Sequence, residues 1–217
     1  MPLFAQITNL LAALFLLVAF AMLAQRRIVH LINLYALQGG ILALSIVAVG
    51  YGTHQESLYL SAALNGLLKV IVIPLILYRL VRRLGLAWNR ENLLRVPTLL
   101  LVGLVLNIFA FDVALPIAHL AGTINRDTFG IALASVLLSL LMMIVRTTAL
   151  TQVLGFLSLE NGLIFAATSV TYGMPMMVEL GIALDVIVGV FILGVFFFHI
   201  REEFDSLDLH RFDRHEE

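Results

Sequence analysis

Long runs of apolar residues, separated by short polar stretches, make up most of the chain. Several runs reach the roughly 20 residues that a helix needs to cross about 30 Å of hydrocarbon. The strands of a membrane barrel are nearer 10 residues long and alternate in polarity, which these runs do not. The pattern therefore predicts an all-α polytopic membrane bundle with seven transmembrane helices. The predicted helices cover residues 3–24, 28–50, 58–79, 96–111, 128–147, 149–171 and 176–200.

The end of the fourth helix stays open at this point. Residues 112–127 follow it and carry Asp112, Pro116 and His119. This piece either lies at the membrane surface or completes the span.

The distribution of arginines predicts the orientation. If the amino terminus is outside, one arginine, Arg126, lies on the outer side and eleven lie on the inner side. Such a bias follows the positive-inside rule, so we expect the carboxy terminus in the cytoplasm and the protein in the inner membrane. The inner arginines are Arg26, Arg27, Arg79, Arg82, Arg83, Arg90, Arg95, Arg146, Arg201, Arg211 and Arg214.

The amino-acid composition limits the kinds of chemical site that this chain can contain. Hydrophobic residues make up 61% of the chain and charged residues 12%, whereas a soluble domain has roughly 25% charged residues. The absence of cysteine excludes zinc–thiolate sites, iron–sulfur clusters and thiolate-ligated nickel–iron centres from this chain. We therefore expect no catalytic, metal-binding or cofactor-binding residues here, and any redox chemistry on another polypeptide.

The candidate functional residues are the polar ones inside the apolar runs. Glu160 and Asp185 lie near the middle of the sixth and seventh runs, and Glu179 lies near the start of the seventh. The third run holds Lys69, the only lysine, and the second holds Gln38. A charge at the bilayer centre costs roughly 2.5–3.5 kcal/mol on insertion scales, so it is found where it has a partner or a function. We predict that these five residues form a proton relay.

The predicted helix that contains Lys69 also contains a proline, Pro74. Pro74 has no backbone N–H, so the carbonyl of Val70 loses its helical partner and the helix is expected to distort there. Such an opening lets water or a side chain reach mid-membrane.

Each relay candidate also has a structural interpretation. Lys69 with Asp185 or Glu160 can be a static ion pair between helices. Gln38 can be an interhelical hydrogen-bonding group, and Glu179 can reach the membrane interface from the end of its helix.

The chain shows an internal similarity between its two halves. Leu37-Gln38-Gly39-Gly40 corresponds to Leu159-Glu160-Asn161-Gly162, and residues 69–74 correspond to 185–190. Helices 1–3 and 5–7 therefore look like two copies of one unit, with the same orientation because a single helix separates them. The expected organisation is a first unit with its basic loop over 1–95, a linking helix and outer loop over 96–127, a second unit over 128–200 and a polar cytoplasmic tail over 201–217.

These residues carry a resemblance to a known family. Arg26-Arg27, the helices with Gln38 and Lys69, and the closing Arg82-Arg83 resemble the three-helix K-type subunit of respiratory complex I and the C subunit of Mrp-type antiporters. Residues 146–201 resemble that subunit again. A chain with two such copies resembles the hydrogenase-4 component E family, the duplicated K-like membrane subunit of formate hydrogenlyase-type nickel–iron hydrogenases.

The resemblance implies a function. In K-type subunits two membrane carboxylates contribute to a proton path, and their positions match Gln38 and Lys69 in the first copy and Glu160 and Asp185 in the second. The resemblance thus implies a non-catalytic membrane-arm subunit that contributes to proton or sodium translocation. Its implied partners are antiporter-like membrane subunits and a cytoplasmic nickel–iron hydrogenase module.

Other functions stay open on the sequence. The chain can be a subunit of an Mrp-type cation/proton antiporter, a self-contained secondary transporter with its site between the repeats, or a structural linker. We also expect contact with the lipid bilayer, and no nucleic-acid partner.

Overall fold

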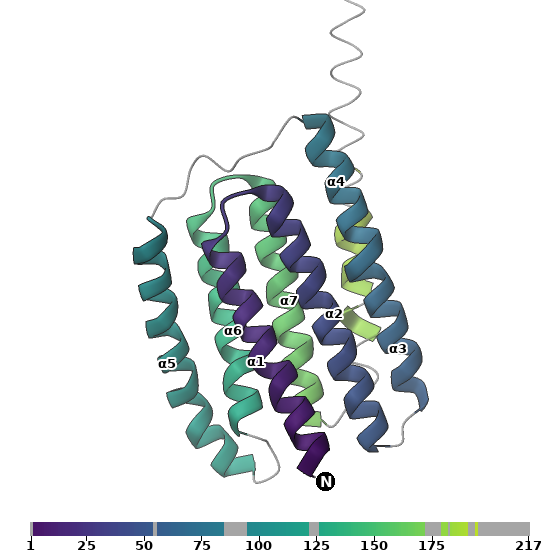
Figure 1. The fold of residues 1–217 in the computed structure, drawn as a ribbon, viewed down its shortest axis with the longest axis vertical. Coiled ribbons are helices and arrows are strands. Elements are labelled where there is room, and N and C mark those ends of the chain that lie inside the picture. Colours follow the sequence, from purple (N-terminus) through teal and green to yellow (C-terminus); the bar gives the residue numbers. More distant parts are fainter. Residues whose placement is uncertain are drawn as a thin grey trace, which may run out of the picture.

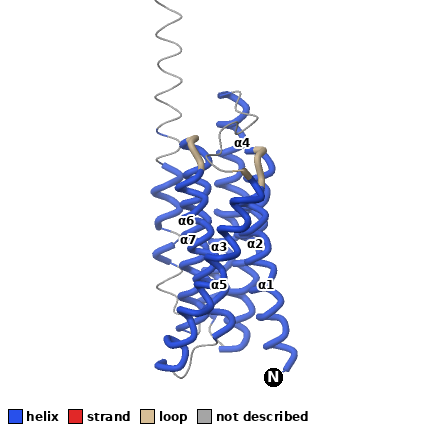
Figure 2. The backbone as a smooth tube through the Cα atoms, turned by 90° about the vertical axis from the view of Figure 1, so that its left-hand side faces the viewer, coloured by secondary structure: helices blue, strands red, loops and turns tan. Residues whose placement is uncertain are grey.

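The computed structural model describes residues 2–53, 56–84, 95–121, 126–171, 179–181, 183–190 and 194. Every element in this part of the chain is helical, and the helices lie side by side in one bundle (Figure 1). The view turned by 90° shows them running along a common direction (Figure 2). The elements are α1 Pro2–Ala24, α2 Ile28–Thr53, α3 Glu56–Gly66, the π-helix η1 Leu67–Val72, α4 Ile73–Leu84, α5 Val96–Ala121, α6 Arg126–Val145 and α7 Ala149–Thr171.

Six stretches of the described chain are long and apolar enough to cross a membrane. They confirm the first six predicted helices, all but the fourth to within a few residues, and α3, η1 and α4 join into a single span. The seventh predicted helix, 176–200, lies largely outside the described residues, although 179–181 and 183–190 are helical. The six spans are Gln6–Ala24, Ile28–Thr53, Leu58–Arg82, Val96–Ile117, Asp127–Val145 and Ala149–Thr168.

The fourth span is longer than its predicted core. Helix α5 continues through Pro116 to Ala121, so residues 112–121 extend the helix instead of forming a separate surface piece. Of the two alternatives left open by the sequence, completion of the span is the one observed.

The bundle packs around two central helices, α6 and α2. Helix α6 contacts α5, α7 and α1, and α2 contacts α1, α3, η1, α4 and α7. The rings of Phe15 on α1 and Phe165 on α7 stack with centroids 4.7 Å apart. Exposed leucines and isoleucines such as Leu101 and Ile144 cover the outside, as expected for a surface that faces lipid.

A buried arginine joins α1 to the connection between α6 and α7. The Nη2 atom of Arg146 donates to the carbonyl oxygens of Met22 at 3.3 Å, Leu23 at 3.2 Å and Gln25. Burial, with a smaller contribution from the nearby charge of Arg26, lowers the pKa of Arg146 to about 10. The side chain is therefore still a cation at neutral pH, placed at the negative end of the α1 dipole.

The distortion predicted before Pro74 takes the form of a π-helix. Residues Leu67–Val72 have π-helical geometry, and the N–H of Ile73 donates to the carbonyl of Leu68, five residues earlier. π-Helical turns are rare in proteins, and those that occur are often found at functional sites. Here the π-helix carries Lys69.

A glycine allows this segment to approach α2. A Cβ atom on Gly39 would lie 2.7 Å from the Cβ of Lys69, whereas one on Gly40 would lie 3.7 Å from Val70, an ordinary contact. Only a glycine therefore fits at position 39 with η1 in place.

We expect Gly39→Ala to destabilise the protein by about 1–3 kcal/mol, because α2 and η1 must separate. Gly40→Ala is the matched control, with a change within about 0.5 kcal/mol. Melting temperatures of the two variants in mild detergent provide the comparison. Equal melting of both variants would mean that the helices adjust freely and that Gly39 is no packing constraint.

Candidate functional site

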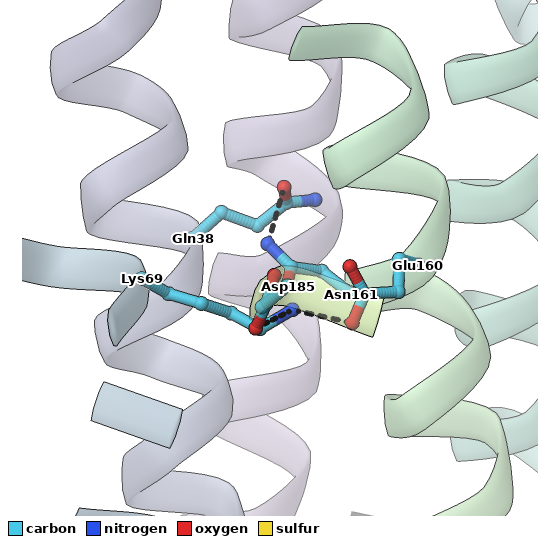
Figure 3. Close-up of polar contacts among 5 residues, drawn as sticks. All are labelled: Gln38, Lys69, Glu160, Asn161 and Asp185. Carbon is cyan, nitrogen blue, oxygen red and sulfur yellow. Dashed lines mark hydrogen bonds and ion pairs between the residues drawn. The ribbon is translucent and has the colours of Figure 1, made fainter. Parts of the chain in front are cut away.

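Three ionisable side chains from distant parts of the chain meet in the middle of the bundle. The Nζ atom of Lys69 in η1 lies 3.0 Å from Oε1 of Glu160 on α7 and donates a hydrogen bond to it. The same Nζ lies 3.2 Å from Oδ2 of Asp185, in the helical piece 183–190. Figure 3 shows the ammonium group between the two carboxylates. We call Lys69, Glu160 and Asp185 the ion triad.

The ion triad is shielded from the surroundings. The exposed fractions are 0% for Lys69, 4% for Glu160 and 1% for Asp185. Buried charges cost several kcal/mol each in lost hydration, and their mutual attraction offsets this only in good geometry. With both acids ionised the triad has a net charge of −1, and one added proton makes it neutral. Its arrangement is therefore suited to a change in protonation by a single proton.

Packing holds Glu160 in place from a second side. Gly181 lies against α7, since a Cβ on it would come within 2.3 Å of Ile164 Cδ1 and 3.2 Å of Glu160 Oε1. The backbone of the segment that leads to Asp185 therefore approaches the Glu160 carboxylate closely.

An amide pair lies beside the ion triad. Nδ2 of Asn161 on α7 donates to Oε1 of Gln38 on α2 at 3.3 Å, and both residues have no exposed surface (Figure 3). This contact is the interhelical hydrogen bond that was one interpretation of Gln38. Because Asn161 follows Glu160 directly, the pair fixes the register of α7 against α2.

Several buried polar atoms around the ion triad lack a hydrogen-bond partner within the described part of the chain. Atoms without a hydrogen-bond partner among the described residues include Tyr35 Oη, both amide atoms of Asn65, Gln38 Nε2 and Asn161 Oδ1. Asn65 precedes Lys69 by four residues and Tyr35 precedes Gln38 by three, so each lies about one helical turn from the site. Buried polar groups nearly always have a hydrogen-bond partner, and internal water molecules fill this role where no protein group does. These atoms leave hydrogen-bonding capacity for internal water at the site.

The structure brings together four of the five predicted residues. Lys69, Glu160 and Asp185 form the ion triad, and Gln38 lies next to it through Asn161. Glu179 is exposed and forms no ion pair within the described residues.

Sequence reasoning missed Asn161, Asn65 and Tyr35. A systematic search for polar residues one turn from Lys69 and Gln38 would have found Asn65 and Tyr35. Asn161 is adjacent to Glu160 and lies within the internal similarity, which was the available signal.

No cluster of three or more histidine, cysteine, aspartate or glutamate side chains suited to a metal ion occurs in the described residues. The ion triad itself contains two carboxylates and an ammonium group, a set that exchanges protons more readily than it holds a divalent cation.

Comparison with known proteins finds two kinds of relative. The uncharacterized protein Rv0085 of Mycobacterium tuberculosis is 31% identical over 180 residues, which cover 82% of each chain. Hydrogenase-4 component E of Escherichia coli K12 is 24% identical over 189 residues, covering 87% of this chain and 88% of its own, and the Shigella flexneri protein of that name matches equally. This is a distant homology over most of the chain. No family model and no solved structure matches the chain significantly.

Proposed function

The chain belongs to one family with the mycobacterial protein Rv0085, and from this membership and the ion triad we propose that it is a non-catalytic membrane subunit of a hydrogenase-like redox complex. The distant homology to hydrogenase-4 component E supports the assignment, because it extends over nearly the full length of both chains. Six membrane-spanning helices in the described part agree with a multi-pass subunit.

Within such a complex the ion triad contributes to the translocation of protons or sodium ions. The observation that carries this proposal is the position of one ammonium group at 3.0 Å and 3.2 Å from two carboxylates that belong to separate helical segments. Protonation of Glu160 removes its attraction for Lys69 and leaves the ammonium paired with Asp185 alone. Protonation of Asp185 instead leaves the ammonium paired with Glu160 alone. The Lys69 ammonium group therefore has two alternative partners, and a conformational change elsewhere in the complex can favour one over the other.

The proposed partners and topology follow from the same site. Seven helices with a single triad make a short proton path, so large antiporter-like membrane subunits and a cytoplasmic nickel–iron hydrogenase module are the proposed partners. The amino terminus is proposed outside and the carboxy terminus inside the inner membrane, in line with the arginine distribution.

The two-unit organisation has structural support at one point. The segments 37–40 and 159–162, which correspond in sequence, lie on α2 and α7, and these helices contact each other. Gln38 of the first segment bonds to Asn161 of the second. We therefore propose that the two K-like units face each other across the ion triad.

The first experiment is gentle purification of the tagged chain from its native membrane, with identification of every accompanying chain by mass spectrometry. We expect antiporter-like subunits together with a nickel–iron hydrogenase module. Antiporter subunits without a hydrogenase would instead assign the chain to an Mrp-type antiporter. Recovery of the chain alone or as a homo-oligomer would contradict the subunit proposal and favour an independent secondary transporter.

The second experiment tests the triad. We expect Asp185→Asn to leave assembly intact and to lower proton-coupled activity at least about tenfold, because a carboxamide cannot take up the relayed proton. Glu56→Gln is the matched control, since it changes an exposed acid at the start of α3, outside the predicted relay, and should leave activity unchanged. Assembly is checked by co-purification and coupling by acidification in inverted vesicles. Full proton-coupled activity of an assembled Asp185→Asn complex would mean that the triad is a static ion pair.

A further inference from the structure

A groove of about 530 Å³ lies on the surface of η1 and α4 that faces away from the ion triad. Its apolar wall includes Val70, Ile71 and Leu75, and its far end is formed by Tyr78, Arg79 and Arg82. The volume is within the range of sites that hold small molecules. The groove is therefore apolar along most of its length and basic at one end.

The basic end lies at the depth of the lipid headgroups. Lys69 is near the middle of the span Leu58–Arg82, and Arg79 is ten residues further along. At 1.5 Å per residue this distance is about 15 Å, half of the roughly 30 Å hydrocarbon core. With Lys69 at mid-membrane, Arg79 and Arg82 reach the phosphate layer while Val70, Ile71 and Leu75 lie beside the acyl chains.

The two guanidinium groups are available for a ligand. Arg79 and Arg82 are exposed, and neither has a carboxylate partner within the described part of the chain. They are spaced three residues apart, so both side chains extend from the same helix face. The Tyr78 hydroxyl donates to Oδ1 of Asn33 on α2, which fixes the aromatic ring at the edge of the groove. An interfacial tyrosine beside two arginines is typical of headgroup contact.

We propose that this groove binds one anionic glycerophospholipid. The phosphodiester pairs with Arg79 and Arg82, since guanidinium groups bind phosphate oxygens in a fork geometry. One acyl chain follows Val70, Ile71 and Leu75 toward mid-membrane. Because Val70 and Ile71 belong to the same π-helix as Lys69, the lipid packs directly against the segment that holds the ion triad.

The first test measures lipid binding to the full-length chain, purified with its native partners. After mild delipidation, phosphatidylglycerol or phosphatidylcholine is added back, and bound lipid is counted by native mass spectrometry. We expect phosphatidylglycerol to bind the Arg79→Gln/Arg82→Gln variant roughly 10- to 30-fold more weakly than the wild type.

The matched control is Arg26→Gln/Arg95→Gln. It removes two exposed arginines, one after α1 and one before α5, that do not line the groove, and it should bind phosphatidylglycerol as the wild type does. Equal loss in both variants, or equal binding of phosphatidylglycerol and phosphatidylcholine by the wild type, would overturn the proposal. Detergent size exclusion confirms that each variant is folded.

The second test identifies the occupant directly and does not depend on the arginine variants. Leu75→benzoylphenylalanine places a photoreactive group inside the groove, and illumination in the native membrane crosslinks whatever lies there. A crosslink to an anionic phospholipid supports the proposal. A crosslink to another polypeptide, or to the acidic residues 201–217 of this chain, shows that a protein segment fills the groove and contradicts it.

Discussion

Replacement of Lys69 by methionine is expected to destabilise the protein by about 3–5 kcal/mol, because Glu160 and Asp185 then face each other without a counter-charge in a low-dielectric interior. The exposed fractions of 4% for Glu160 and 1% for Asp185 leave both carboxylates almost without contact with solvent. At about 2–4 °C for each kcal/mol, the melting temperature in mild detergent should fall by roughly 10 °C.

A compensating variant separates the loss of charge balance from the loss of packing. Lys69→Met combined with Glu160→Gln and Asp185→Asn removes all three charges at nearly constant volume, and we expect it to recover most of the stability. If the triple variant melts as low as Lys69→Met, the lysine stabilises through its contacts with Gly39 and α2, and its charge contributes little. The triple variant should still lack proton-coupled activity, which distinguishes stability from function.

The lengths of the apolar runs were sufficient to predict the spans. A helix must satisfy its own backbone hydrogen bonds in hydrocarbon, so run length translates directly into element length. This constraint placed the boundaries of α1, α2, α6 and α7 within a few residues. It also identified Lys69, Glu160 and Asp185, because a charge stands out in a run that contains almost none.

The packing faces could not be predicted in the same way. In a soluble bundle the apolar stripe marks the core, but here both the lipid-facing surface and the core are apolar, so Leu101 and Leu138 look alike in sequence and differ in burial. Small and polar residues mark the contacts instead, as Ser139 and Ser158 do with hydroxyl oxygens 2.9 Å apart between α6 and α7.

The local geometry of the Lys69 helix was predicted only in part. The missing N–H of Pro74 is visible in the sequence, but whether the helix kinks or adopts π-geometry depends on the neighbours that it packs against. One such neighbour is α2, which approaches so closely that a Cβ atom on Gly39 would lie 2.7 Å from the Lys69 Cβ. A long-range contact of this kind has no signature in the sequence of η1 alone.

Arg146 was predicted only as a topological charge, yet its side chain is 1% exposed and closes the end of α1. The last carbonyls of a helix have no partner within the helix, and many helices end with a glycine that satisfies them. The sequence after Ala24 is Gln25-Arg26-Arg27, which contains no glycine. The Nη2 atom of Arg146 instead donates to three carbonyl oxygens of this turn.

We therefore expect Arg146→Met to destabilise the protein by about 3 kcal/mol, since hydrogen bonds to a charged donor contribute roughly 1.5–3 kcal/mol each. The carbonyls of Leu23 and Gln25 lose this donor, whereas that of Met22 keeps a bond from the N–H of Gln25. The backbone carbonyl of Arg146 keeps its bond from Gln152 Nε2 at 2.9 Å, so the variant isolates the side chain. Arg26→Met, at an exposed position on the same connection, should change stability by less than about 0.5 kcal/mol.

Hydrogen exchange locates the effect. Amides in the last turn of α1 should exchange faster in Arg146→Met, while those of α5, whose carbonyls are not among the three that Arg146 Nη2 contacts, should keep their rates. Arg146→Lys retains the favourable charge at the helix terminus but lacks the planar fork that reaches three carbonyls, so we expect it to recover only part of the lost stability. Full recovery by lysine would mean that the cation acts on the α1 dipole alone, and unchanged exchange in Arg146→Met would mean that interfacial water satisfies the end of α1 without the arginine.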